Sequence, residues 1–225
     1  MSKILVIDTS QAKTGVGIFE SGRVQAVFSD SSRQSAQEVL PLIQRLLDAC
    51  GLQLTALDAI AVVTGPGSFT GLRIGIGVAQ GLGASLERPL LGLSSLALLA
   101  FSAGMEHGLA NWLVAQQARE NELYFAAYRF DSTRGCVLAG REQVASYVEL
   151  DSLSSQFIES SVAGEMWALA GSAWQHHEPE ETFVSHLQAH SMEDACVMAN
   201  LKFGLGETVG ELLLPNYIKE ELDYS

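Results

Sequence analysis

Short blocks of apolar residues separated by turn residues mark the first thirty positions of the chain. The blocks at 3–8, 14–20 and 23–29 have the length of strands, and the turn Glu20-Ser21-Gly22-Arg23 joins the last two tightly. This pattern predicts an antiparallel meander of three strands.

The spacing of apolar positions then becomes helical. Residues 35–50 repeat apolar positions every three or four residues after the capping-box pattern that begins at Ser35. Pro41 leaves two alternatives, a helix that bends there or one that begins at Leu40. The elements predicted next alternate as in a β-α-β unit: a strand at 59–64, a helix at 71–84, a strand at 89–92 and a helix opened by Ser94 or Ser95.

The same order of three strands, helix, strand and helix returns in the second half. The predicted elements are strands at 112–115, 122–128 and 136–139, a helix near 150–160, a strand at 166–170 and a helix capped by Ser191. This repeated order of elements predicts two related α/β lobes, at 1–104 and 105–211. The remaining segment, 212–225, begins with apolar residues that should dock back on the protein.

Composition narrows the classes of function. With 225 residues and 48% apolar residues, the chain can bury a real core. Its formal charge of −13 would repel phosphates, so we expect any nucleic-acid role to run through a partner. Three widely spaced cysteines without a Cys-x-x-Cys pair suit reduced thiols, and no apolar run is long enough for a signal peptide or a membrane span. These features predict a cytoplasmic protein.

A glycine-rich segment, Gly65 to Gly77, joins the strand at 59–64 to the following helix. A phosphate-binding P-loop would need Lys-Ser or Lys-Thr where Leu72-Arg73 stand, and a dinucleotide fingerprint would not fall inside the helix. Within the helix, Gly71, Gly75, Ala79 and Gly83 recur every four residues and share one face. Two explanations stay open, a contact face for a partner and ordinary packing of the helix on its own sheet. The first predicts that Gly75→Trp prevents dimerisation and leaves the lobe folded.

Candidate chemistry is sparse elsewhere. Asp8, at the end of the first strand, could be a metal-linked acid, but capping of its own turn is favoured. Four histidines, His176, His177, His186 and His190, raise the possibility of a zinc site, yet no ligand-spaced cysteine or carboxylate pair frames them. No Ser-His-Asp order or nucleophile elbow is evident either. The residues therefore identify no catalytic group.

Three motifs carry a resemblance to a known family: Ile7-Asp8-Thr9-Ser10, the segment Gly65 to Gly75, and Pro215-Asn216-Tyr217-Ile218-Lys219. With these motifs the chain resembles the bacterial TsaB (YeaZ) family over its whole length. The resemblance implies a two-lobed α/β fold of the actin, hexokinase and Hsp70 (ASKHA) kind. It also implies a role in adding threonylcarbamoyl to N6 of adenosine 37 in tRNAs that read codons beginning with A.

The resemblance further implies a non-catalytic scaffold and its partners. Such a protein forms a heterodimer with the metal-containing transferase TsaD, joins the ATPase TsaE, forms a homodimer when alone, and meets tRNA only through the complex. ATP and metal then belong to the partner subunits. This chain has Ser35-Ala36-Gln37-Glu38-Val39 where TsaD carries a His-x-x-x-His metal pair, and it departs from many relatives at Ser35 and at Gln117 to Glu122. The expected interface comprises Val39, Leu42, Ile43, Leu46, Gly71, Arg73, Ile74, Gly75, Val78, Ala79, Leu82 and Gly83.

Two rivals to the scaffold role remain. One is a nucleotide-dependent kinase or ATPase of the same fold that uses Asp8. The other is a peptidase, for which the sequence offers no nucleophile or metal motif.

Overall fold

The structure is a computed structural model that describes residues 2–30, 35–119, 121–159, 165–176, 182–209, 212–216 and 218. Its contacts divide the chain into two compact units, Met1–Ser95 with Ser191–Asn216, and Leu96–His190 with Tyr217–Ser225. Each unit contains one mixed sheet with helices, which confirms the predicted fold class. The division differs from a split at 104 and 211, because the helix that begins at Ser95 joins the second unit and the one that begins at Met192 joins the first.

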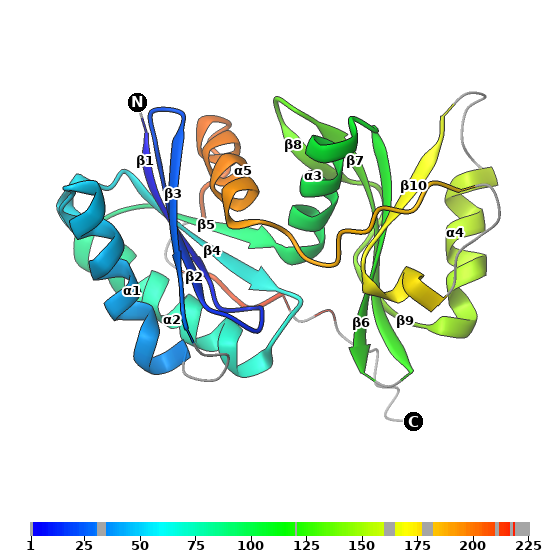
Figure 1. Cartoon of the computed structure of the whole chain (residues 1–225), viewed down its shortest axis with the longest axis horizontal. Coiled ribbons are helices and arrows are strands. Elements are labelled where there is room, and N and C mark those ends of the chain that lie inside the picture. Colours follow the sequence, from blue (N-terminus) through cyan, green and yellow to red (C-terminus); the bar gives the residue numbers. More distant parts are fainter. Residues whose placement is uncertain are drawn as a thin grey trace. The chain divides into compact units, whose positions relative to one another are not determined.

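The first unit is built on a five-stranded sheet in the order β3-β2-β1-β4-β5 (Figure 1). β1, β2 and β3 form the predicted antiparallel meander, and β4 and β5 continue parallel to β1. Every residue of β4 is buried, as expected for a central parallel strand. The strands are β1 (Lys3–Asp8), β2 (Gly15–Glu20), β3 (Arg23–Phe28), β4 (Ala59–Gly65) and β5 (Leu90–Ser94).

Helices cover both faces of this sheet. α1 (Ser35–Cys50) and α2 (Phe69–Leu86) lie side by side on one face, and their buried side chains join Val16 and Ile18 of β2 in one apolar core. Side chains alternate along a strand, so Gly17 of β2 points to the opposite face of the sheet from Val16 and Ile18. α5 (Met192–Gly204) covers that face, because a Cβ at Gly17 would lie 2.5 Å from Sγ of Cys196. α1 begins at Ser35 with Pro41 inside it, so it does not begin at Leu40.

Residues 208–209 and 212–216 belong to the first unit as well. The N–H of Val209 donates to the Leu90 carbonyl at 2.8 Å, and the N–H of Asn216 donates to the Thr64 carbonyl at 2.8 Å. Between these points Leu213 is buried in the core. Residues 208–209 and 212–216 therefore lie beside the β5 edge of the sheet.

The second unit has a sheet in the order β10-β6-β7-β8, with β9 also paired to β7. Its core places Leu113, Phe125 and Trp167 against residues of α4. The ring of Phe101 in α3 packs at a tilt against that of Phe130. Sequence reasoning missed β9, a short and half-buried strand. The elements are α3 (Ser95–His107), β6 (Asn111–Arg119), β7 (Glu122–Asp131), β8 (Gly135–Leu138), β9 (Gln143–Ser146), α4 (Leu150–Glu159) and β10 (Trp167–Ala170), with single helical turns at Leu54–Ala56, Tyr147–Glu149 and Ser172–His176.

Candidate protein-interaction surface

The Asp8 carboxylate caps its own turn. It accepts hydrogen bonds from the Ser10 amide at 2.8 Å, the Ser10 hydroxyl at 2.6 Å and the Gln11 side-chain amide at 3.0 Å. Asp8 is only 3% exposed, so these groups replace the water that a free carboxylate would bind. This arrangement favours the turn-capping role among the two considered for Asp8.

The glycine-rich segment lets α2 approach the loop that follows β1. Ser68 caps α2 by accepting from the Gly71 amide at 3.2 Å, and the Thr9 hydroxyl donates to the Gly71 carbonyl at 2.7 Å. A Cβ at Gly71 would lie 1.9 Å from the Thr9 carbonyl oxygen. The chain itself thus fills the space at this helix end, where a phosphate-binding loop would hold its ligand.

The series of small residues in α2 faces the chain's own sheet. A Cβ at Gly75 would lie 2.3 Å from the Thr9 hydroxyl oxygen, and one at Gly83 would lie 2.6 Å from the Leu90 side chain. Ala79 is fully buried. For Gly71, Gly75, Ala79 and Gly83 the structure therefore corrects the expectation of an open contact face. Packing of the helix on its sheet explains them, and Gly75→Trp should unfold the unit.

The structure also corrects the expectation that four apolar residues of α1 belong to an interface. Their side chains lie in the core between helix and sheet, because the apolar stripe of an amphipathic helix faces its own sheet. They are Val39, Leu42, Ile43 and Leu46.

The solvent side of α1 and α2 presents a different set of residues. Leu40 and Phe69 are each 55% exposed, and the Arg73 guanidinium lies 3.7 Å above the centre of the Phe69 ring. Gly77 and Gly81 are exposed, with open space where a Cβ would point. We call Leu40, Phe69, Arg73, Gly77 and Gly81 the outer face. Of the expected interface residues, Arg73 belongs to it, and Ile74, Val78 and Leu82 are half-buried.

The two outer glycines were missed, although their spacing of four offered a signal. A glycine inside a helix costs about 1 kcal/mol relative to alanine. At Gly71, Gly75 and Gly83 close packing within the chain offsets this cost, but no described residue packs closely on Gly77 or Gly81. A partner that packs closely on the outer face would account for both.

The cysteines and histidines do not form a catalytic or metal-binding cluster among the described residues. Burial raises the pKa of the Cys136 thiol, and burial together with Glu193 raises that of Cys196 to about 12, so both are poor nucleophiles. His186 is exposed and His190 is buried; His176 ends a single helical turn, and His177 lies outside the described residues. Across the described ranges, no three His, Cys, Asp or Glu side chains are grouped to hold a metal ion.

A helix that crosses a membrane must be both long and apolar. Among the residues that the structure describes, no helix is both long and apolar enough to cross a bilayer.

Comparison with known proteins identifies the family. Residues 27–156 match the family model of TsaD, tRNA N6-adenosine threonylcarbamoyltransferase. The TsaB protein of Escherichia coli (strain K12), a tRNA threonylcarbamoyladenosine biosynthesis protein, is 36% identical across 77% of this chain and 72% of its own. The TsaB protein of Buchnera aphidicola subsp. Schizaphis graminum is 28% identical across 80% and 82%.

A solved structure agrees over nearly the full length. YeaZ from Pseudomonas aeruginosa superposes with a TM-score of 0.81 and 35% identity, covering 96% of this chain and 100% of that one. The chain therefore belongs to the TsaB (YeaZ) family, within the wider family that the TsaD model describes.

Proposed function

We propose that this chain is a non-catalytic subunit in the formation of threonylcarbamoyladenosine in tRNA, and that it pairs with the threonylcarbamoyltransferase TsaD. Its TsaB relatives are tRNA threonylcarbamoyladenosine biosynthesis proteins, which supports the pathway. In this proposal the metal and ATP belong to the partner subunits, and TsaE joins the pair. tRNA meets this acidic chain only within the cytoplasmic complex.

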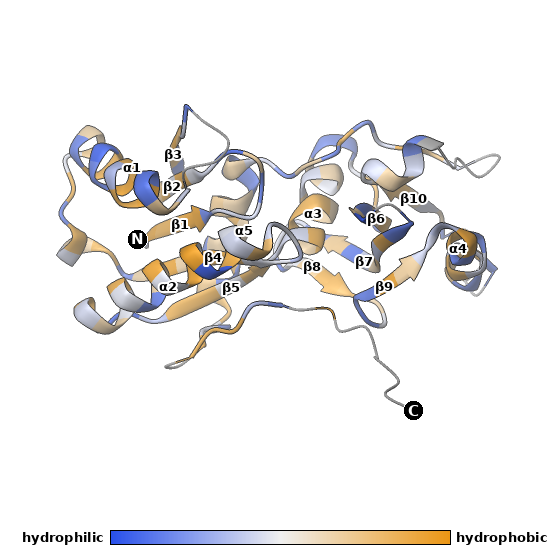
Figure 2. Ribbon diagram, turned by 90° about the horizontal axis from the view of Figure 1, so that it is seen from below, coloured by the Kyte–Doolittle hydropathy of each residue, from blue (hydrophilic) through white to orange (hydrophobic). Residues whose placement is uncertain are grey.

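The proposed pairing rests on the exposed residues of the outer face of α1 and α2. Figure 2 shows the two helices beside each other in the first unit. An exposed aromatic residue with a stacked arginine is typical of interface anchors, and Gly77 and Gly81 allow another backbone to approach α2. The same face would serve a homodimer when the transferase is absent, as one surface that serves both partners.

A single bulky substitution tests the pairing. Gly81→Trp should leave the free energy of unfolding nearly unchanged, because its side chain enters open space, and should block the close approach of a partner. Light scattering of the chain mixed with the transferase of its own organism should then show separate proteins, where the unmodified chain forms a one-to-one complex.

Gly204→Trp is the matched control. Gly204 is another exposed helical glycine with open space around it, but it lies on α5, on the opposite face of the sheet. This variant should bind normally. If Gly81→Trp also binds normally, the outer face is not the interface; if the unmodified chain forms no complex, the pairing itself is wrong.

A further inference from the structure

Residues 212–216 contact α2, β4 and β5 of the first unit but form no helix or strand themselves. We call this segment the strap. The side-chain amide of Gln80 in α2 donates to the Leu213 carbonyl at 2.8 Å. The Asn216 amide donates to the Thr64 carbonyl near the end of β4 at 2.8 Å. Backbone groups of the strap are therefore bound at two points, one on a helix and one on a strand.

One leucine of the strap is buried, and β5 leaves room for it. Leu213 is 6% exposed, and its Cδ2 lies 3.0 Å from the position that a Cβ would take at Gly92. A larger residue at position 92 would take part of the space that this leucine fills. Thr64, Gln80 and Gly92 thus form a site that holds two backbone groups and one leucine side chain. We call these three residues the strap site.

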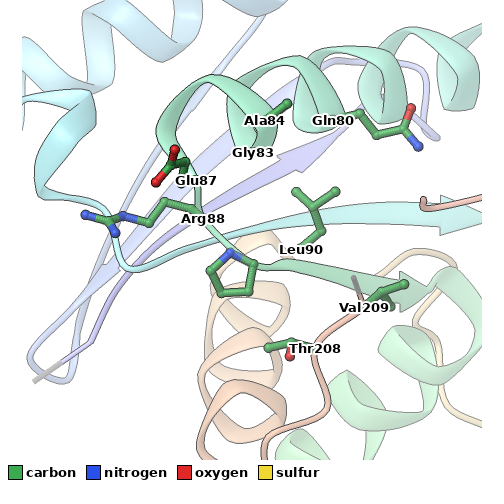
Figure 3. A pocket seen from close by; sticks show the side chains of 9 residues that line it. Gln80, Gly83, Ala84, Glu87, Arg88, Leu90, Thr208 and Val209 are labelled. Atoms are coloured by element: carbon green, nitrogen blue, oxygen red, sulfur yellow. The ribbon is translucent and has the colours of Figure 1, made fainter. Parts of the chain in front are cut away.

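The rest of the strap is exposed to solvent. Leu212 is 64% exposed and Leu214 66%, so only one of the three leucines of the strap is buried. Beside the strap a pocket of about 560 Å³ stays open, with Gln80, Leu90 and Val209 in its lining (Figure 3). Segments with few buried apolar contacts open locally at a lower free energy than the whole domain. The strap therefore resembles a bound peptide more than an element of the core.

Proteins bind peptides through contacts of this kind, in which backbone hydrogen bonds supply affinity and a place for one side chain supplies specificity. We propose that the strap site is a peptide-binding site, that residues 212–216 occupy it as an intramolecular ligand, and that they leave it without unfolding of the sheet. The segment that fits is uncharged, with a leucine to bury and a backbone amide three residues later for the Thr64 carbonyl. This inference does not depend on the outer face or on its partner.

Hydrogen exchange of the unmodified chain tests the release of the strap. The amides of Asn216 and Ile60 both donate to backbone carbonyls, but only Ile60 lies in a central strand of the sheet. The protection factor of Asn216 should be at least tenfold lower, because opening of the strap costs less than unfolding of the sheet. Equal protection would mean that the strap leaves only when the whole unit unfolds, and would overturn the inference.

A peptide added to the full chain tests the binding site. Leu213→Ala removes the buried side chain of the strap and keeps both backbone contacts. Fluorescence anisotropy should show that this variant binds a labelled peptide of residues 212–216 at least tenfold more tightly than the unmodified chain. The reason is that the tethered strap competes at an effective concentration of about millimolar. Leu212→Ala is the matched control, since Leu212 is exposed, and it should bind the peptide as the unmodified chain does.

Variants of the strap site and of the peptide complete the test. Gly92→Val, added to the Leu213→Ala chain, places a side chain where the leucine of the peptide would lie and should abolish binding. A peptide that carries Leu213→Ala should not bind either. The inference is overturned if the Leu213→Ala chain binds neither peptide or both equally. Failure of that chain to fold would show that the strap is part of the core, and would overturn it too.

Discussion

At the scale of single residues, Gly71 and Gly77 have opposite surroundings within one helix. A Cβ at Gly71 would meet the Thr9 carbonyl, whereas one at Gly77 would meet nothing. Gly71→Ala should therefore lower the free energy of unfolding by about 1–3 kcal/mol through overpacking. Gly77→Ala should raise it by about 1 kcal/mol through helix propensity. Urea denaturation of both variants measures this, and equal effects would contradict the placement of α2 on the sheet.

Burial of a thiol predicts how stability depends on pH. The pKa of Cys196 rises from 9.0 to about 12 because the site is buried and lies near Glu193. The folded state thus holds its proton more tightly than the unfolded state, so the contribution is complete below pH 9 and is lost as pH rises from 9 to about 12. Denaturation midpoints measured across this range should fall, and less steeply in Cys196→Ala.

At the scale of elements, the segment 212–216 buries one side chain, that of Leu213, in the first unit. Leu213 is 6% exposed, and its methyl group lies 3.0 Å from the Cβ position of Gly92. Leu213→Asp should lower the free energy of unfolding by about 2–5 kcal/mol, since it buries a charge in place of a leucine. Leu212→Asp, on the exposed neighbour, should change it little. Similar losses in both would mean that the segment does not dock through Leu213.

Elements with strong periodicity were predictable, and their neighbours in space were not. The meander followed from its short apolar blocks and the turn at Glu20 to Arg23, and α2 from the β-α-β order of elements, whereas β9 offered only four residues, of which Ala145 is buried. The small-residue face of α2 showed that something approaches closely, but sequence spacing is the same whether Thr9 or a partner approaches. The interface residues inferred from that face were therefore buried ones, and Gly77 and Gly81 were overlooked.

At the scale of the whole molecule, the first unit is assembled from two separate stretches of chain. α5 covers one face of its sheet, and residues 208–209 and 212–216 lie beside β5. A chain ended at His190 should lose protease resistance in residues 1–95. All three tryptophans, Trp112, Trp167 and Trp174, are buried in the second unit, so their emission should stay native. Loss of that emission would show that the second unit does not fold by itself.

The ribosome makes the two stretches of the first unit at different times. Its sheet is complete once residue 94 has been made, yet α5 begins only at residue 192, after Leu96–His190 of the second unit. At about 5–20 residues per second, the ribosome takes several seconds or more to reach α5. During that interval the face of β2 with Gly15 and Gly17 lacks its cover. The nascent chain thus exposes an apolar sheet to chaperones and to other chains, and the late arrival of α5 sets when that exposure ends.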